Sequence, residues 1–91
     1  MMRIARHVRV VGRVQGVFFR AWTREHARRL QVDGWVRNCS DGSVEAELEG
    51  RQNAVLELID LLREGPSGAK VDAVQIEETK PEGFGSFEVR H

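Results

Sequence analysis

Residues 8–22 have the sequence VRVVGRVQGVFFRAW, and within this stretch the spacing of apolar residues changes from that of a strand to that of a helix. Val8, Val10 and Val14 alternate with polar residues, as in a strand with one buried face. After Gly16 the spacing becomes helical, and one face of the expected helix carries mostly apolar residues. The residues of this face are Phe19, Thr23, Ala27 and Leu30. This stretch therefore predicts a strand followed by a helix over about residues 20–30.

The chain after this helix continues with short, well-separated elements. Gly34 is expected to end the helix, residues 35–39 to form a short strand, and residues 40–43 (SDGS) to form a hairpin turn of the Asp-Gly type. In the next strand apolar residues alternate with glutamates, which predicts one core face and one solvated, acidic face. The apolar positions are Val44, Ala46 and Leu48, and the glutamates are Glu45, Glu47 and Glu49.

A second amphipathic helix follows, with apolar residues at positions i, i+3, i+4 and i+7, and GPSG at residues 65–68 ends it. These apolar residues are Val55, Leu58, Ile59 and Leu62. Val74 and Ile76 predict another strand, and Phe87 with Val89 a short last one. The order βαββαβ plus a short C-terminal strand predicts an α+β, ferredoxin-like split βαβ sandwich. Two helices would pack on one face of a mainly antiparallel sheet.

Composition limits the size and the class of the protein. A chain of 91 residues with 41% hydrophobic content supports one domain, residues 1–91, with one core. It contains no apolar run long enough to span a membrane and no secretory signal pattern, so we expect a cytoplasmic protein without membrane contact. The one cysteine, Cys39, has no partner for a disulfide or a zinc cluster. No cluster has metal-ligand spacing, so we expect no metal and no cofactor.

The zero net charge conceals an uneven distribution of charge. Residues 1–38 contain nine arginines and two acidic residues, a net charge of +7, and residues 39–91 therefore carry −7. A basic half attracts phosphate groups on small molecules or nucleic acids, but it also forms ordinary surface ion pairs with an acidic half. Charge alone does not decide between these roles.

The junction between the first strand and the first helix has the features of an anion site. The first N–H groups of a helix lack internal partners, and a glycine such as Gly16 lets several of them converge on one phosphate group. Arg20 would add a planar cation that donates two parallel hydrogen bonds. The sequence has no Walker motif. A plain turn glycine and a surface arginine remain the alternative for this stretch taken alone.

Two separated motifs make the junction more specific. The pattern VxGxVQGVxFR occupies residues 10–20 and GWVRN residues 34–38. With DGSVE at 41–45, GPSGAKVD at 65–72 and FEVRH at 87–91, the chain resembles the acylphosphatases, small hydrolases of carboxyl-phosphate anhydrides. The resemblance covers nearly the whole chain.

The resemblance implies a role for particular residues. The phosphate-binding arginine falls on Arg20 and the water-positioning asparagine on Asn38. The phosphate-binding backbone would be that of the loop Gln15, Gly16, Val17, Phe18, Phe19 and Arg20. Phe18 stands where many members have a second glycine. The C-terminus lies near the site in this family, and His91 stands where an aromatic residue is commoner.

The resemblance also implies the ligands: an acyl phosphate as substrate and inorganic phosphate as product and inhibitor, with no nucleic acid partner and a monomeric protein. An RNA-recognition module is the first alternative, but Phe84 and Phe87 are three residues apart and cannot share one strand face. A regulatory domain that binds an anion without hydrolysis is the second, and it would not require Asn38. We expect His26 to be a solvated helix histidine rather than a general base.

Overall fold

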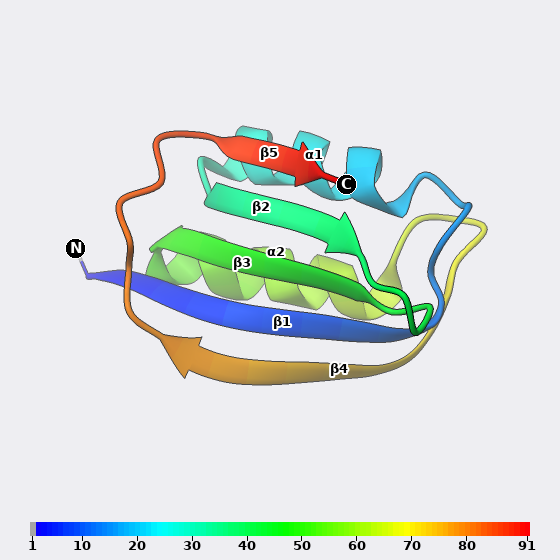
Figure 1. Cartoon of the computed structure of the whole chain (residues 1–91). Helices are drawn as coiled ribbons and strands as arrows, with labels where there is room; N and C mark the ends of the chain where they lie inside the picture. The colour runs from blue at the N-terminus through cyan, green and yellow to red at the C-terminus, as the bar shows by residue number, and fades with distance from the viewer. Residues whose placement is uncertain (1) are drawn as a thin grey trace.

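Two helices pack on one face of a five-stranded sheet (Figure 1). A computed structural model describes residues 2–91. The elements are β1 (Arg3–Arg13), α1 (Phe19–Leu30), β2 (Asp33–Asn38), β3 (Val44–Arg51), α2 (Gln52–Glu64), β4 (Lys70–Thr79) and β5 (Phe87–Arg90). The strand order is β4-β1-β3-β2-β5, and β5 runs parallel to β2 while the other neighbours are antiparallel. The predicted ferredoxin-like α+β fold is confirmed.

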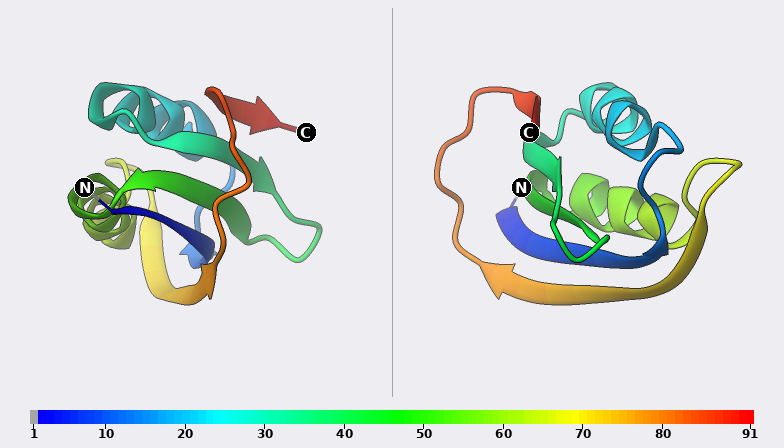
Figure 2. Two further views of the ribbon diagram at one scale, coloured as in Figure 1. Left: turned by 90° about the vertical axis from the view of Figure 1, so that its left-hand side faces the viewer. Right: turned by 45° about the vertical axis from the view of Figure 1, so that its right-hand side comes forward.

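The hydrophobic core lies between the sheet and the two helices, which the two views of Figure 2 show on the same side of the sheet. Alternate residues of the central strands point toward the helices, and the apolar stripe of each helix points back at them. The buried strand residues include Val8, Val10, Val36, Val44, Ala46 and Leu48. Those of the helices include Phe19, Ala27, Val55, Leu58, Ile59 and Leu62. The predicted core faces of the central strands and both helices are therefore confirmed.

Helix α1 ends at Leu30 as predicted, but Gly34 is not what ends it. The helix ends at Leu30 because Gln31 adopts a left-handed conformation, with φ 60°, and returns its N–H to the last turn. Gly34 does not end the helix; it lies within β2, opposite Leu48. Its φ is 135°, and a Cβ atom there would overlap the carbonyl oxygen of Glu47. The role of Gly34 is therefore to allow β2 and β3 to approach closely, and not to end the helix.

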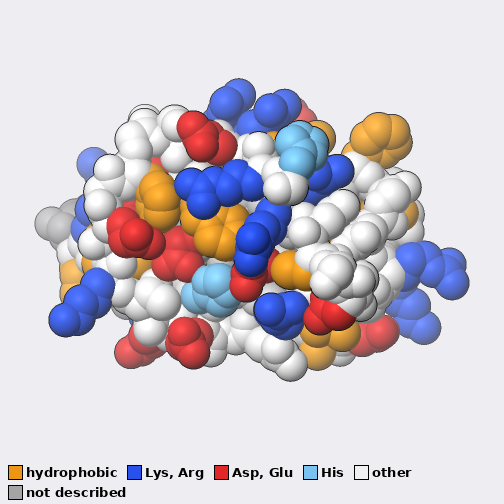
Figure 3. Space-filling model, viewed as in Figure 1, with side chains coloured by type: hydrophobic (Ala, Val, Ile, Leu, Met, Phe, Trp, Pro, Cys, Tyr) orange, Lys and Arg blue, Asp and Glu red, His pale blue; other side chains and the backbone are white. Residues whose placement is uncertain are grey.

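The predicted solvated face of β3 is wrong. Glu45, Glu47 and Glu49 are 7%, 6% and 0% exposed. They do point away from the helices, as the alternation requires, but β3 is the middle strand of the sheet. Basic side chains from the neighbouring strands lie over them, and Figure 3 shows these groups gathered on the open face of the sheet. The acidic face of β3 is therefore an ion-pair layer.

The two edge strands, β4 and β5, are consecutive in the chain, so residues 80–86 pass the ends of the strands between them (Figure 1). This connection is attached to β3 through Glu49, whose carboxylate accepts hydrogen bonds from the N–H groups of Glu82, Gly83 and Phe84. Its course determines where β5 and the C-terminus lie.

Candidate active site

Three segments that are distant in the sequence meet beside the N-terminal end of α1. They are the loop between β1 and α1, the end of β2, and the end of β5 with His91, which lie on the same side of the molecule in Figure 1. A cavity of about 490 Å³ lies between them. Its polar and loop residues include Gly16, Phe18, Arg20, Arg24, Asn38 and His91.

The loop that precedes α1 has an unusual backbone. Gly16 and Phe18 both adopt left-handed conformations, with φ of 75° and 61°. Phe18 is the N-cap residue of α1, and no side chain caps the first turn of the helix. The first turn contains no acidic residue either. The N–H groups of this turn and the positive end of the helix dipole are therefore available to an anion.

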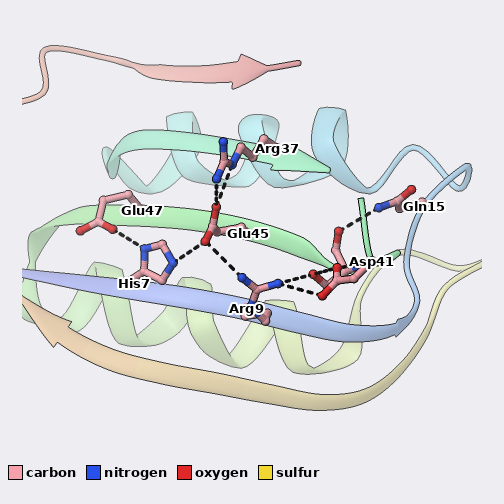
Figure 4. A network of polar contacts seen from close by, with 8 residues as sticks. His7, Arg9, Gln15, Arg37, Asp41, Glu45 and Glu47 are labelled. Atoms are coloured by element: carbon pink, nitrogen blue, oxygen red, sulfur yellow. Dashed lines mark hydrogen bonds and ion pairs between the residues drawn. The ribbon is translucent and has the colours of Figure 1, made fainter. Parts of the chain in front are cut away.

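The side chain of Gln15 supports this loop in a way that the sequence analysis missed. Its Nε2 atom donates hydrogen bonds to the carbonyl oxygens of Cys39 and Ser43, at 2.8 and 2.9 Å. These two residues flank the turn between β2 and β3, so the loop is tied to the strand that ends in Asn38 (Figure 4). An amide with two donors beside a glycine loop was the only signal of this role in the sequence.

The turn itself is held by a second set of polar contacts. The carboxylate of Asp41 accepts hydrogen bonds from the N–H and the hydroxyl group of Ser43, at 2.9 and 2.6 Å. These two hydrogen bonds lower the pKa of Asp41 below its usual value, and the bond from the hydroxyl group has the larger effect. Arg9 on β1 donates to both residues (Figure 4). The hairpin predicted from SDGS is present, and these hydrogen bonds fix the turn that follows Asn38.

Arg20 lies in the first turn of α1 and points toward the C-terminus. Its Nη1 atom is 3.1 Å from Nδ1 of His91 and 3.5 Å from the carbonyl oxygen of Arg90. A guanidinium group donates and cannot accept, so Nδ1 of His91 is the acceptor in this contact. The sequence analysis left the role of His91 open, and the structure brings it to the predicted phosphate-binding arginine.

Asn38 is the last residue of β2, opposite Val44 of β3. Residues that are directly opposite in a sheet point to the same face, and Val44 is buried toward the helices. Asn38 therefore points to the helix side, where it lines the same cavity as Arg20. The two side chains that the resemblance singled out, 18 positions apart in the sequence, come from two elements to one site.

The six loop residues named in the sequence analysis fall into two groups. Gly16, Phe18, Phe19 and Arg20 line the cavity. Gln15 instead contacts the hairpin through its side chain, and Val17 packs against the core. The ring of Phe19 is only 2% exposed, so its N–H group rather than its side chain is suited to an anion.

The electrostatic character of the cavity is basic. Arg20 and Arg24 are one helical turn apart on α1, and none of the described residues that line the cavity is acidic. His26 is not among the lining residues; it is half-buried, edge-on against the ring of Trp22 with centroids 4.7 Å apart, and Arg29 donates to it. The prediction of a solvated His26 is thus corrected in part. It packs against a helix neighbour, outside the cavity.

Two further observations concern metal binding and membrane spans. Within residues 2–91, His, Cys, Asp and Glu side chains form no group of three that could hold a metal ion. Neither helix of this part of the chain has the length and hydrophobicity of a membrane span.

A small α+β sandwich with a basic cavity at an uncapped helix N-terminus defines a class of proteins suited to a phosphoryl group. The family model described as Acylphosphatase matches residues 6–89. An acylphosphatase of Methanothrix thermoacetophila is 48% identical over 88 residues, which cover 97% of this chain and 98% of that relative. The solved acylphosphatase of Coxiella burnetii superimposes with a TM-score of 0.93 at 43% identity, covering 97% of this chain and 93% of its own.

The acylphosphatase of Bacillus subtilis gives a TM-score of 0.94 at 32% identity, with 97% of this chain and 99% of the other covered. The chain belongs to the acylphosphatase family. It is an enzyme that hydrolyses the carboxyl-phosphate anhydride bond of acyl phosphates to a carboxylate and phosphate.

Proposed function

We propose that the loop of residues 15–20 and Arg20 bind the phosphoryl group of the acyl phosphate, and that Asn38 positions the attacking water. One observation carries this proposal: Arg20 and Asn38 line one cavity in front of a helix N-terminus that no side chain caps. An anion there would accept hydrogen bonds from the free N–H groups and from the guanidinium group.

The leaving group explains why the site needs little acid–base chemistry. The bond that breaks joins phosphorus to a carboxylate oxygen, and a carboxylic acid has a pKa of only about 4 to 4.5. The electron pair of that bond therefore leaves with the carboxylate without prior protonation. The protein must bind the phosphoryl oxygens, stabilise their charge and align the water. Arg20 and the helix N–H groups serve the first two tasks.

Asn38 serves the third task. Its amide can donate to a water or accept from it without changing its protonation state. As the water oxygen bonds to phosphorus, a phosphoryl oxygen of the substrate takes the water's proton. Neither Arg20 nor Asn38 is a base, and His91 accepts a hydrogen bond from Arg20 through Nδ1, which leaves the ring proton on Nε2. The absence of an acidic side chain from the described cavity lining supports this assignment.

The same geometry has consequences for the product and for the state of the protein. Inorganic phosphate presents the oxygens that the loop binds, so we expect it to inhibit by competition with the substrate. All of the residues proposed to act come from one chain, so a monomer suffices. The free thiol of Cys39 suits the reducing conditions of a cytoplasm.

The first test measures phosphate release from benzoyl phosphate by the purified protein in the presence of a chelator. We expect turnover without added metal. Arg20→Ala should lower kcat/KM at least about a thousandfold, the scale of removing an arginine from a phosphoryl-transfer site, and should weaken inhibition by phosphate. Arg20→Lys should recover only part of both, because a point charge lacks the two parallel donors. Arg29→Ala, outside the cavity on the same helix, is the matched control.

The second test separates catalysis from anion binding. Asn38→Ala should lower kcat by at least about a hundredfold, as for one lost polar group in a preorganised site, and should change the inhibition constant of phosphate only slightly. A folded Asn38→Ala protein with the parent kcat would exclude the water-positioning role. Loss of phosphate affinity as large as that of Arg20→Ala would instead assign Asn38 to the phosphate-binding loop.

A further inference from the structure

Phe18 is an exposed aromatic residue beside the cavity. Its side chain is 86% exposed, the largest value among the exposed large hydrophobic residues of the described chain, which also include Met2, Leu56 and Ile76. Burial of an aromatic ring is among the larger favourable contributions to folding. The ring of Phe18 makes almost no such contribution.

The backbone of Phe18 adds a second, independent observation. The residue has φ 61° and ψ 24°, a left-handed conformation that is a genuine outlier for a bulky side chain. It is also the N-cap of α1, a position that favours Ser, Thr, Asp or Asn, and it provides no side-chain cap. Neither burial, nor backbone preference, nor capping accounts for a phenylalanine here. Local strain of this kind is found at functional sites.

The surroundings of Phe18 indicate what its ring contacts. The residue lines the cavity together with Arg20 and Asn38. The other apolar side chains of the lining include Val14 and Phe19, which are 1% and 2% exposed and are used by the core. Phe18 is the large apolar side chain of the lining that the protein leaves uncovered.

The stereochemistry of the reaction gives the occupant. In an in-line displacement the leaving group departs on the side opposite to the attacking water. With the water at Asn38 and the phosphoryl group at the loop, the acyl group extends away from Asn38 toward the outer part of the cavity. An uncovered ring on the phosphate-binding loop itself is within reach of the first atoms of that acyl group.

The geometry points to Phe18 as a specificity-determining residue whose ring packs against the acyl group. The enzyme then favours acyl phosphates with an aromatic or extended apolar acyl group over those with a small one such as acetyl. The inference rests on the proposed binding of the phosphoryl group by residues 15–20. The left-handed backbone holds the ring at the mouth of the cavity before substrate binds, so little order has to be gained on binding.

The test compares kcat/KM for benzoyl phosphate and for acetyl phosphate in a set of Phe18 variants. Phe18→Asn removes the ring but tolerates the left-handed backbone, and Phe18→Tyr keeps the ring. We expect the benzoyl-to-acetyl ratio of kcat/KM to fall about tenfold in Phe18→Asn, the scale of one apolar contact in a specificity pocket, and to stay near the parent value in Phe18→Tyr. Leu56→Asn, an exposed apolar residue of α2 outside the cavity, is the control.

Thermal melts complete the test, because the ring buries little surface and Phe18→Asn should melt no lower than the parent. An unchanged benzoyl-to-acetyl ratio in a folded Phe18→Asn protein would overturn the inference. Equal losses for both substrates would also overturn it and assign Phe18 to the shape of the loop. The proposed phosphate binding is tested separately by the Arg20→Ala measurements, because inhibition by inorganic phosphate involves no acyl group.

Discussion

The amide of Gln15 links the loop before α1 to a hairpin 24 and 28 positions further along the chain. At the scale of single residues this link matters because Arg20 and Asn38 belong to the two parts that it joins. The left-handed backbone of Phe18 in this loop is costly and persists only where the surrounding structure supports it. The two hydrogen bonds of Gln15 support the observed conformation and tie the loop to the hairpin that follows β2.

We therefore predict that Gln15→Leu impairs catalysis without any contact to the substrate. The change removes both donors and leaves the carbonyl oxygens of Cys39 and Ser43 without these partners, at a cost of about 1–3 kcal/mol in the free energy of unfolding. A small displacement of a catalytic loop lowers rates strongly, so kcat/KM should fall at least about tenfold. Urea unfolding and steady-state kinetics measure the two effects.

Gln75→Leu provides the control for this prediction, because Gln75 is exposed on the edge strand β4. It should leave both quantities near the parent values. A Gln15→Leu protein with the parent kcat/KM would mean that the loop keeps its conformation without the tie to the hairpin.

At the scale of elements, β3 combines two functions on its two faces. Its apolar residues complete the core, and its glutamates lie under basic side chains from β1 and β2 (Figure 4). Within the described residues, no buried side-chain nitrogen or oxygen lacks a hydrogen-bond partner, so these carboxylates are satisfied. Such buried charges are costly to leave unpaired.

Glu49 offers a test of this arrangement. It is 0% exposed, accepts a hydrogen bond from Arg3 at 2.9 Å, and also holds the connection that leads to β5. Glu49→Gln keeps the shape but removes the charge and turns one oxygen into a donor. We predict a loss of about 2–4 kcal/mol in the free energy of unfolding, near the cost of breaking a buried pair. Amide hydrogen exchange should accelerate over residues 82–90.

Glu88→Gln, an exposed change on β5, is the matched control and should stay within about 0.5 kcal/mol of the parent protein. Because β5 leads to His91 at the cavity, Glu49→Gln should also lower kcat/KM at temperatures where the protein is still folded. Unchanged exchange over residues 82–90 would show that the connection is held by other contacts.

The errors of the sequence analysis lie at this scale. Alternation within residues 44–49 predicts which glutamates share a face, but whether that face is solvated depends on the strand order, which places β3 in the middle. Gly34 resembles a helix terminator because it follows the helix in the sequence. Its actual role depends on a close contact with Glu47, 13 positions further along the chain, which local sequence does not reveal. Arg20 and Asn38 were singled out through the motifs that carry the family resemblance, and the structure brings them to one cavity. The contacts of Gln15 and His91 join distant segments and could not be.

At the scale of the whole molecule, the uneven charge distribution along the chain has a structural explanation. Five of the nine arginines of the first 38 positions lie on β1 and β2, and three of them form ion pairs with acidic residues of β3: Arg3 with Glu49, Arg9 with Glu45 and Arg37 with Glu45. Of the two interpretations of this charge, the pairing of the two halves is present in the fold. Arg20 and Arg24 instead line the cavity, where they contribute positive charge.

His7 makes this layer sensitive to pH. Its two ring nitrogens lie 2.8 Å from Glu47 and 2.8 Å from Glu45. Both contacts are hydrogen bonds at once only when both nitrogens carry a proton, that is, in the imidazolium form. Burial by itself lowers the pKa of His7, but the hydrogen bonds with Glu47 and Glu45 outweigh it and raise the pKa above its usual 6.5.

The carboxylates respond in the opposite sense. Burial by itself raises the pKa of Glu45, but the hydrogen bonds from Arg37 and His7 outweigh it and lower the pKa below its usual 4.5. For Glu49, burial is likewise outweighed, by Arg3 and the backbone N–H of Glu82, and its pKa is also lowered. The stability from these two groups is present above about pH 4.5 and is lost as the pH falls through their folded pKa values.

The raised pKa of His7 has the reverse consequence. Its stabilising contribution is complete below about pH 6.5 and is lost as the pH rises through the folded pKa, since the unfolded chain releases that proton more readily. We therefore predict that the free energy of unfolding, measured with urea between pH 3 and 9, is greatest between about pH 4.5 and 6.5. His7→Gln should abolish the decline on the alkaline side and retain the acid limb, whereas the control His26→Gln should retain both. A parent protein that is more stable at pH 8 than at pH 6 would show that the contacts of His7 with Glu45 and Glu47 do not favour the imidazolium form.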